Sequence, residues 1–186
     1  HSTRRTGWSV ANGQIDLGII GGQLPNDLEN LLQIIPYATD ELALVLPTKH
    51  QLANKKELLK EDLYKLNFVS LDSQSTTRKV VDKLLKDSGL DIQRLKIEME
   101  LNSLEAIKNA VQSGLGASFL PVVSIERELA GGTIHKAYVA DLEVKRELKL
   151  ITNPSRYTSR ASDAFKKNIL PQFASLESPL RQIKFY

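Results

Sequence analysis

A run of hydroxyl-bearing and basic side chains has the chemistry of an anion site. It reads SLDSQSTTRK over residues 70–79, and it offers six neighbouring donor side chains: Ser73, Gln74, Ser75, Thr76, Thr77 and Arg78. An apolar run precedes it and an amphipathic stretch follows, so it is predicted to join a strand end to a helix start. Helix N-termini attract anions through unpaired N–H groups and partial positive charge. Simple N-capping by Ser75 or Thr76 is the structural alternative, but one cap needs only one hydroxyl.

Two further clusters have similar form. Residues 2–6 (STRRT) place donors at a predicted helix start, with capping and solvated arginines as the alternative. The pair Gly21-Gly22 ends an apolar run and would let a ligand approach backbone amides, although a plain turn explains it equally well. Ligands of open α/β sheets bind beyond the carboxyl ends of strands. All three clusters are predicted to lie at such ends, which favours a binding site.

Residues suited to catalysis or metal binding are scarce. The chain has no cysteine, which excludes disulfides, a catalytic thiol and cysteine-based metal sites. Its histidines, His1, His50 and His135, have no carboxylate at a ligand-like spacing, and no nucleophile-elbow, Walker or dinucleotide motif occurs. The sequence therefore predicts no catalytic residues, no metal site and no cofactor, and favours a binding module over an enzyme.

The elements that must position these clusters alternate between strands and helices, which predicts an α/β fold. Short apolar runs predict seven strands, over residues 15–20, 42–46, 67–71, 96–101, 117–120, 133–139 and 147–152. Residues 15–20 have the pattern of a buried parallel strand. Amphipathic stretches predict six helices, over residues 5–12, 57–66, 77–88, 102–113, 121–130 and 158–170. Gly89 and Gly114 are predicted to end two of them, and Asn102 with Glu105 to cap one.

Several motifs, in this order and spacing, resemble LysR-type transcriptional regulators over nearly the whole chain. They are ANGQIDLGIIGG at residues 11–22, ELALVLPTKHQLA at 41–53, AVQSGLGASFLP at 110–121 and the SRASDAF helix at 159–165. Within that family the chain resembles the RuBisCO-operon and inorganic-carbon-uptake regulators of cyanobacteria and algal plastids. That narrower resemblance rests on HSTRRT at residues 1–6, SLDSQSTTR at 70–78, ELNSLEAIKNA at 100–110 and LITNPSRY at 150–157.

The resemblance implies two Rossmann-like lobes joined by two crossing strands, as in type 2 periplasmic binding proteins. Lobe one would comprise residues 1–46 plus 147–186, and lobe two residues 47–146. The first strand and helix of lobe one, and the DNA-binding winged helix-turn-helix, are expected upstream of His1.

The resemblance also implies an effector cleft between the lobes. By position in the family motif, lobe one would contribute Thr3, Arg4, Gly21 and Gly22. Lobe two would contribute Ser73, Gln74, Ser75, Thr76 and Arg78, with Asn102 and Ser103 at another helix start. This donor-rich set suits an anionic effector, such as ribulose 1,5-bisphosphate or 2-oxoglutarate. Arg78 and Thr76 are expected to carry much of the affinity.

The expected partners are a small-molecule effector, further copies of the chain, and promoter DNA through the upstream domain. The family implies a dimer, and a tetramer for the full-length protein, in the cyanobacterial cytoplasm or the chloroplast stroma. No apolar run approaches the roughly 18 residues that a membrane span needs. A periplasmic-type solute-binding protein for a small anion is the alternative function. An enzyme on the same scaffold, such as a deaminase holding its cofactor through cysteine, is disfavoured by the absence of cysteine.

We expect the chain not to bind DNA by itself. Its net charge is only +3, from 25 basic and 22 acidic residues, and the basic residues are scattered as doublets. Duplex binding depends on neutralising many phosphates from one stripe or helix face. Fluorescence anisotropy with promoter duplex at moderate salt should show no sequence-dependent affinity; specific binding below one micromolar would contradict the assignment.

Overall fold

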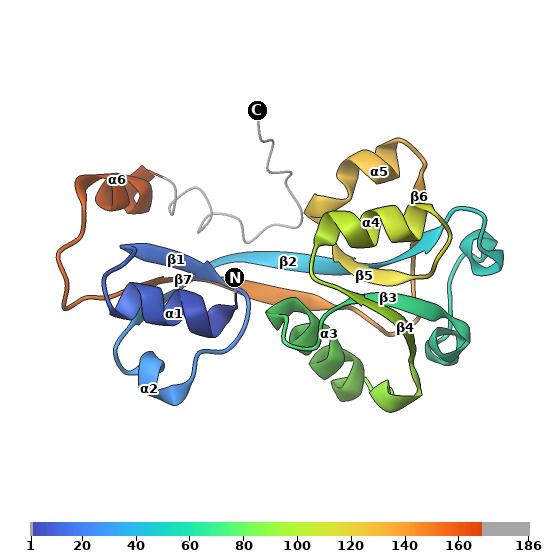
Figure 1. The fold of residues 1–186 in the computed structure, drawn as a ribbon, viewed down its shortest axis with the longest axis horizontal. Coiled ribbons are helices and arrows are strands. Elements are labelled where there is room, and N and C mark those ends of the chain that lie inside the picture. The colour runs from blue at the N-terminus through green and yellow to red at the C-terminus, as the bar shows by residue number, and fades with distance from the viewer. Residues whose placement is uncertain (1, 169–186) are drawn as a thin grey trace. The chain divides into compact units, whose positions relative to one another are not determined.

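Two strands carry the chain between its two parts. A computed structural model describes residues 2–168 (Figure 1). Unit 1 comprises His1–Thr39 with Glu147–Tyr186, and unit 2 comprises Asp40–Arg146. Strands β2 (Gln33–Pro47) and β7 (Lys145–Thr152) are neighbours in one sheet, and each runs across a unit boundary. The described chain therefore has the two crossing strands that the family resemblance implies.

Strand β2 is buried on both faces within unit 2. Its alternate residues enter two different apolar clusters, with Leu42, Leu44 and Leu46 in one and Ala43 and Val45 in the other. Successive strand residues point to opposite faces, so a strand covered on both sides reads as an unbroken apolar run. Residues 40–46 consequently belong to unit 2, whereas the sequence analysis placed them in lobe one.

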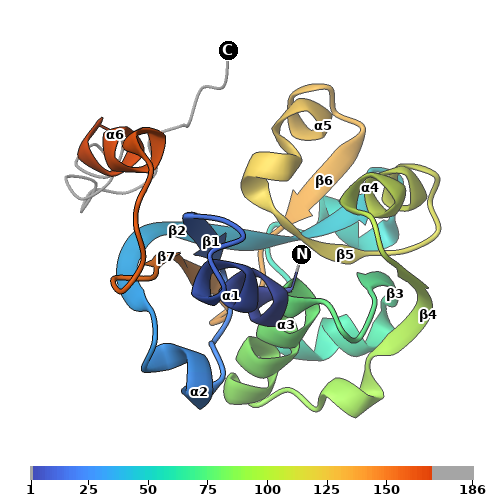
Figure 2. The same ribbon diagram turned by 60° about the vertical axis from the view of Figure 1, so that its left-hand side comes forward.

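Unit 2 combines antiparallel and parallel pairing. Strands β5 (Ser118–Pro121) and β6 (Ile134–Ala137) pair antiparallel with β2. Strands β3 (Asn67–Leu71) and β4 (Lys96–Leu101) pair parallel with each other and have the predicted bounds. Helices α3 (Thr76–Asp87) and α4 (Leu104–Gln112) lie on opposite sides of these strands, as Figures 1 and 2 show, and they pack into the two different clusters. The unit is thus a layered α/β structure.

The longer helices lie within two residues of their predicted bounds where these are described. Helix α1 spans Thr3–Ala11 and α6 spans Arg160–Asn168; the predicted end of the latter lies outside the described residues. Helices α3 and α4 end where glycines were expected to stop them. Gly89 and Gly114 have φ values of 91° and 85°, a left-handed backbone that glycine adopts without steric penalty.

Two predicted helices are wrong in extent. Only a 3₁₀ helix over Lys60–Lys65 forms within residues 57–66, because Leu58 is extended and its N–H donates to the Tyr138 carbonyl at 2.8 Å. Residues 121–130 begin as the end of β5. A turn closed by the Ser124 hydroxyl on the Pro121 carbonyl follows, and α5 spans only Glu126–Ala130.

Unit 1 differs from its prediction in strand direction. Strand β1 (Leu17–Ile20) pairs antiparallel with β7, with Leu17 opposite Thr152, and Ile19 is 42% exposed rather than buried. A short apolar run does not encode the direction of its neighbour, which here arrives from the far end of the chain. The short helix α2 (Asn26–Glu29) and the first half of β2 were not predicted, because both lack a clear apolar period.

A buried carboxylate organises the start of the Lys60–Lys65 turn. Asp62 accepts hydrogen bonds from the Leu59 N–H at 3.1 Å, Lys55 Nζ at 3.2 Å and Lys65 Nζ at 2.8 Å, and its side chain is 5% exposed. These interactions, led by the bond from Lys65, lower the pKa of Asp62 from 3.8 to about 2. The ionised form is therefore favoured in the folded state.

Asp62→Asn should destabilise the protein at neutral pH. A carboxyl pKa that is depressed by folding contributes stability above its unfolded value, and that contribution disappears as the pH falls from about 4 through 2. We expect a loss of about 1–2 kcal/mol at pH 7, since both lysine partners are largely exposed and screened. At pH 2 the variant and the wild type should converge in urea unfolding. Glu61→Gln, the same charge change at an exposed neighbour, should have little effect; an equal loss for both variants would contradict the specific role of Asp62.

Candidate functional site

The carboxyl ends of β3 and β4 meet at one edge of unit 2. Their pairing places Leu71 opposite Leu101, and the Asp72 N–H donates to the Leu101 carbonyl at 3.0 Å. Helices α3 and α4 begin a few residues beyond these two strand ends. The loop of residues 73–75 and the pair Asn102-Ser103 are thereby brought to the same edge, where α/β sheets commonly bind ligands.

The loop before α3 is ordered by Asp72 rather than by its hydroxyl groups. The Asp72 side chain accepts from the Gln74 N–H at 2.9 Å, and its carbonyl accepts from the Ser75 N–H at 2.9 Å. Ser75 occupies the N-cap position of α3, yet its side chain makes no capping hydrogen bond. The proposed alternative of a simple Ser75 cap is therefore not what the structure contains.

The neighbouring helix starts behave differently. Ser103 caps α4 by accepting from the Ala106 N–H at 3.5 Å, and Ser2 caps α1 by accepting from the Arg5 N–H at 3.3 Å. A first helical turn has N–H groups without intrahelical partners, and a cap side chain normally satisfies one of them. At α3 the hydroxyl of the N-cap serine makes no such bond.

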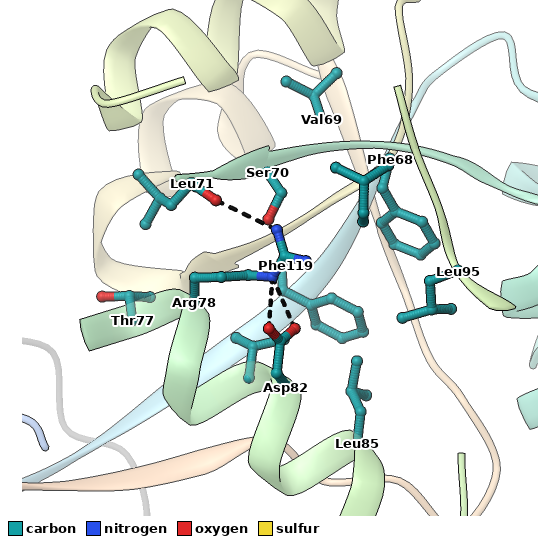
Figure 3. Close-up of a pocket in the computed structure, with 12 residues that line it drawn as sticks. Phe68, Val69, Ser70, Leu71, Thr77, Arg78, Asp82, Leu85, Leu95 and Phe119 are labelled. Carbon is teal, nitrogen blue, oxygen red and sulfur yellow. Dashed lines mark hydrogen bonds and ion pairs between the residues drawn. The ribbon is translucent and has the colours of Figure 1, made fainter. Parts of the chain in front are cut away.

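Arg78 is engaged by the protein itself. Its Nε donates to both carboxylate oxygens of Asp82 at 2.7 and 2.8 Å, and its Nη1 donates to the Leu71 carbonyl at 3.3 Å (Figure 3). Nη1 also donates to Glu100 at 3.4 Å. The side chain is 15% exposed. The guanidinium thus fastens α3 to the ends of β3 and β4, and two carboxylates oppose its charge. Sequence reasoning missed both of them as partners.

Below Arg78 lies an apolar pocket. The rings of Phe68 and Phe119 stack with centroids 6.1 Å apart, and Leu85 and Leu95 line the same space (Figure 3). Phe68 and Leu85 belong to the larger core cluster of unit 2. The apolar side chains that line the pocket therefore pack α3 against the strands and set the position of its first turn.

Thr77, the second residue of α3, has a partner that no local pattern indicated. Its Oγ1 accepts from Arg146 Nη1 at 2.8 Å, and the same guanidinium donates to Asp40 through Nε at 2.9 Å and Nη2 at 2.6 Å. These residues are 69 and 106 positions apart in the sequence. Only the tertiary structure brings them together.

The predicted residues of unit 1 form a separate set. Thr3 is 7% exposed, Arg4 is exposed, and Gly21 and Gly22 are half-buried in the bend after β1. Ser2 caps the helix on which Thr3 and Arg4 lie, as the structural alternative supposed. The convergence of this set with that of unit 2 on one ligand stays a prediction.

A buried lysine in unit 2 has a structural role. Lys108 Nζ lies 2.7 Å from Glu105 and 2.8 Å from Glu128 and donates to the Ser124 carbonyl at 3.2 Å, joining α4 to α5. The hydrogen bonds that Lys108 donates to Glu105 and Glu128 raise its pKa, whereas a nucleophilic lysine needs a lowered one. Within residues 2–168, no group of three His, Asp or Glu side chains is arranged to hold a metal ion. No helix in that range is long and apolar enough to cross a membrane.

Comparison with known proteins decides the family. The profile of the LysR substrate binding domain matches residues 2–174. The chain belongs to this family. A probable RuBisCO transcriptional regulator of Synechocystis sp. strain PCC 6803 is 59% identical over 175 residues, covering 94% of this chain and 51% of the relative. One of the same description from Porphyra purpurea is 54% identical, covering 94% and 55%. The chain thus spans about half the length of these LysR relatives.

Solved LysR-family structures share the fold. The CcmR regulatory domain of Synechocystis PCC6803, in complex with 2-PG, matches with a TM-score of 0.79 at 22% identity, covering 94% of this chain and 81% of that one. The effector binding domain of QuiR, in complex with shikimate, gives the same TM-score and identity, with 95% and 80% covered. These matches confirm the expected α/β fold of the periplasmic-binding-protein type. Family membership also confirms a binding domain rather than an enzyme.

Arg78→Ala should lower the stability of this LysR domain. The change removes the Nε–H group that both oxygens of Asp82 share and the bond to Leu71, so we expect a loss of about 1–2 kcal/mol in urea unfolding at pH 7. Lys83→Ala is the matched control on the same helix. Lys83 pairs with Asp87 at the same spacing, but both side chains are more than half exposed, so the expected loss is below about 0.5 kcal/mol. Equal losses would show that Arg78 has no anchoring role.

Proposed function

We propose that this chain is the effector-sensing domain of a transcriptional regulator of RuBisCO or other carbon-fixation genes. The family assignment and the names of the curated relatives support that proposal. One observation carries the site assignment: the first turn of α3 has no cap from Ser75, in a loop that Asp72 and Leu101 hold at the shared edge of β3 and β4.

Hydroxyl and amide groups are the direct ligands in this proposal. Ser75 and Thr76 would donate to the anion, with the exposed Ser73 and Gln74 beside them and the positive end of α3 behind. Arg78 acts differently from the expectation based on sequence. Because its Nε and Nη1 already donate to protein acceptors, it positions the loop rather than supplying most of the affinity.

The edge of β4 offers a second group of contacts. Asn102 is exposed and lies beside the Leu101 carbonyl that binds the Asp72 N–H. Ser103 already accepts from Ala106, so its hydroxyl hydrogen is the part available to a ligand. Thr3, Arg4, Gly21 and Gly22 would complete the site from unit 1, as the family resemblance implies.

The effector class is a small phosphorylated or dicarboxylate anion. Neutral hydrogen-bond donors at a helix start suit several such molecules, including ribulose 1,5-bisphosphate, 2-oxoglutarate and 2-phosphoglycolate. The last of these matches the 2-PG bound to the CcmR regulatory domain. No cofactor is needed for this role.

The proposed regulator works as a homo-oligomer, a dimer of this domain and a tetramer when full length. It contacts promoter DNA through a winged helix-turn-helix that lies outside this chain. The cyanobacterial and algal origins of the relatives support a place in the cyanobacterial cytoplasm or the chloroplast stroma.

Ser75→Ala should weaken anion binding without destabilising the protein. A hydrogen bond to a charged group contributes roughly 1.5–3 kcal/mol, so the dissociation constant should rise about ten- to a hundredfold. The urea midpoint should stay unchanged, because the Ser75 hydroxyl makes no cap bond. Calorimetric titration of the chain with 2-phosphoglycolate, ribulose 1,5-bisphosphate and 2-oxoglutarate measures the affinities.

The control for this titration is Ser113→Ala, an exposed serine at the other end of α4, which should bind like the wild type. Binding of none of the three anions would contradict the proposed effector class. Unchanged affinity in Ser75→Ala would remove the start of α3 from the site.

A further inference from the structure

Arg146 joins the first turn of α3 to both strands that leave unit 2. Its guanidinium donates to Thr77 on α3 and to Asp40 on β2, and Arg146 itself lies on β7. Asp40 and Arg146 are the first and last residues of unit 2. One side chain therefore connects the proposed anion-binding helix with the two points where the chain passes into unit 1.

The cluster is well shielded from water. The Asp40 side chain is 7% exposed and that of Arg146 is 14% exposed. Next to it, the Leu42 N–H donates to the Val144 carbonyl at 2.8 Å, which ties the two chain segments together. Hydrogen bonds to charged groups are strengthened where water is excluded, so the arrangement of Thr77, Arg146 and Asp40 is strongly coupled.

We propose that Arg146 is the positioning residue that couples anion binding at α3 to strands β2 and β7. The proposal rests on the anion-binding function assigned above. In this proposal Thr77 donates a hydrogen bond to the anion, and binding changes how firmly Arg146 holds Asp40. The anion itself need not touch Arg146.

The Thr77 hydroxyl makes this coupling work. Its oxygen accepts from Arg146, which leaves its hydrogen to be donated. When an anion at the start of α3 accepts that hydrogen, the polarised oxygen becomes a better acceptor for Arg146. Binding and the Thr77–Arg146 bond then strengthen each other, and the linkage is reciprocal. A stronger bond to Thr77 restrains Arg146 and its ion pair with Asp40. The neighbouring segments that carry Leu42 and Val144 are restrained with them.

Hydrogen exchange of single amides followed by NMR tests the proposal. Saturating 2-phosphoglycolate should slow exchange of the Leu42 N–H in the wild type at least about fivefold more than that of the Val69 N–H. Val69 bonds to Ala117 within the same unit and reports the general stabilisation by the ligand. Thr77→Val, again at saturation, should abolish the extra slowing at Leu42, whereas Thr77→Ser should retain it.

Asp40→Asn tests the other end of the chain of contacts. The variant keeps the shape and burial of the side chain but weakens its hold on Arg146, so it should bind the anion and lose the extra slowing. Equal slowing of Leu42 in Thr77→Val and in the wild type, at saturation, would overturn the coupling and leave the binding site in place. Failure of the wild type to bind 2-phosphoglycolate at all, even at millimolar concentration, would overturn both the site and the coupling.

Discussion

The burial of both faces of β2 is the constraint on which unit 2 depends. Its alternating residues divide between two apolar clusters, so each face needs its own cover of helices and strands. Val81 and Leu85 of α3 pack into one cluster, and Ile107 and Val111 of α4 pack into the other. Since the two helices follow β3 and β4, which end at one edge, the demand for burial also sets where both helices begin.

The serines at the starts of the three helices are used differently. The hydroxyl oxygens of Ser2 and Ser103 accept hydrogen bonds from backbone N–H groups in the first turns of α1 and α4. Ser75 makes no such bond, although the serine at this position could cap α3. Arg78, which a reader of the sequence would assign to an anion, instead anchors the helix through Asp82 and the Leu71 carbonyl. The proposed site therefore consists of neutral donors, and the ion pair of Arg78 with Asp82 holds the helix that carries them.

The proposed sensing function gives the two crossing strands a role. A sensing domain must convert occupancy into a change elsewhere, and a ligand shifts an equilibrium only by binding two states differently. The strands that pass between the units are the covalent route for such a change. Arg146 and Asp40 lie where those strands leave unit 2, and Thr77 connects them to the proposed site. The proposed coupling thus depends on a few buried polar contacts.

Sequence by itself determined the α/β class, the bounds of β3 and β4, the positions of α1, α3 and α4, and the family. These follow from local periodicity, from glycine stops and from motif order, all of which act over short stretches of chain. Local periodicity overestimates the helical content of residues 57–66, because the pairing of extended Leu58 with Val139 is a distant interaction.

Tertiary structure alone decided how the charged and hydroxyl side chains are used. Whether Ser75 caps its helix, and whether Arg78 faces a ligand or Asp82 and Glu100, depends on geometry that residue type does not encode. The contact between Asp40 and Arg146 joins residues 106 positions apart. Hydrogen bonds need atoms within about 3 Å at suitable angles, and only the packing of apolar residues elsewhere in the fold brings such distant groups that close.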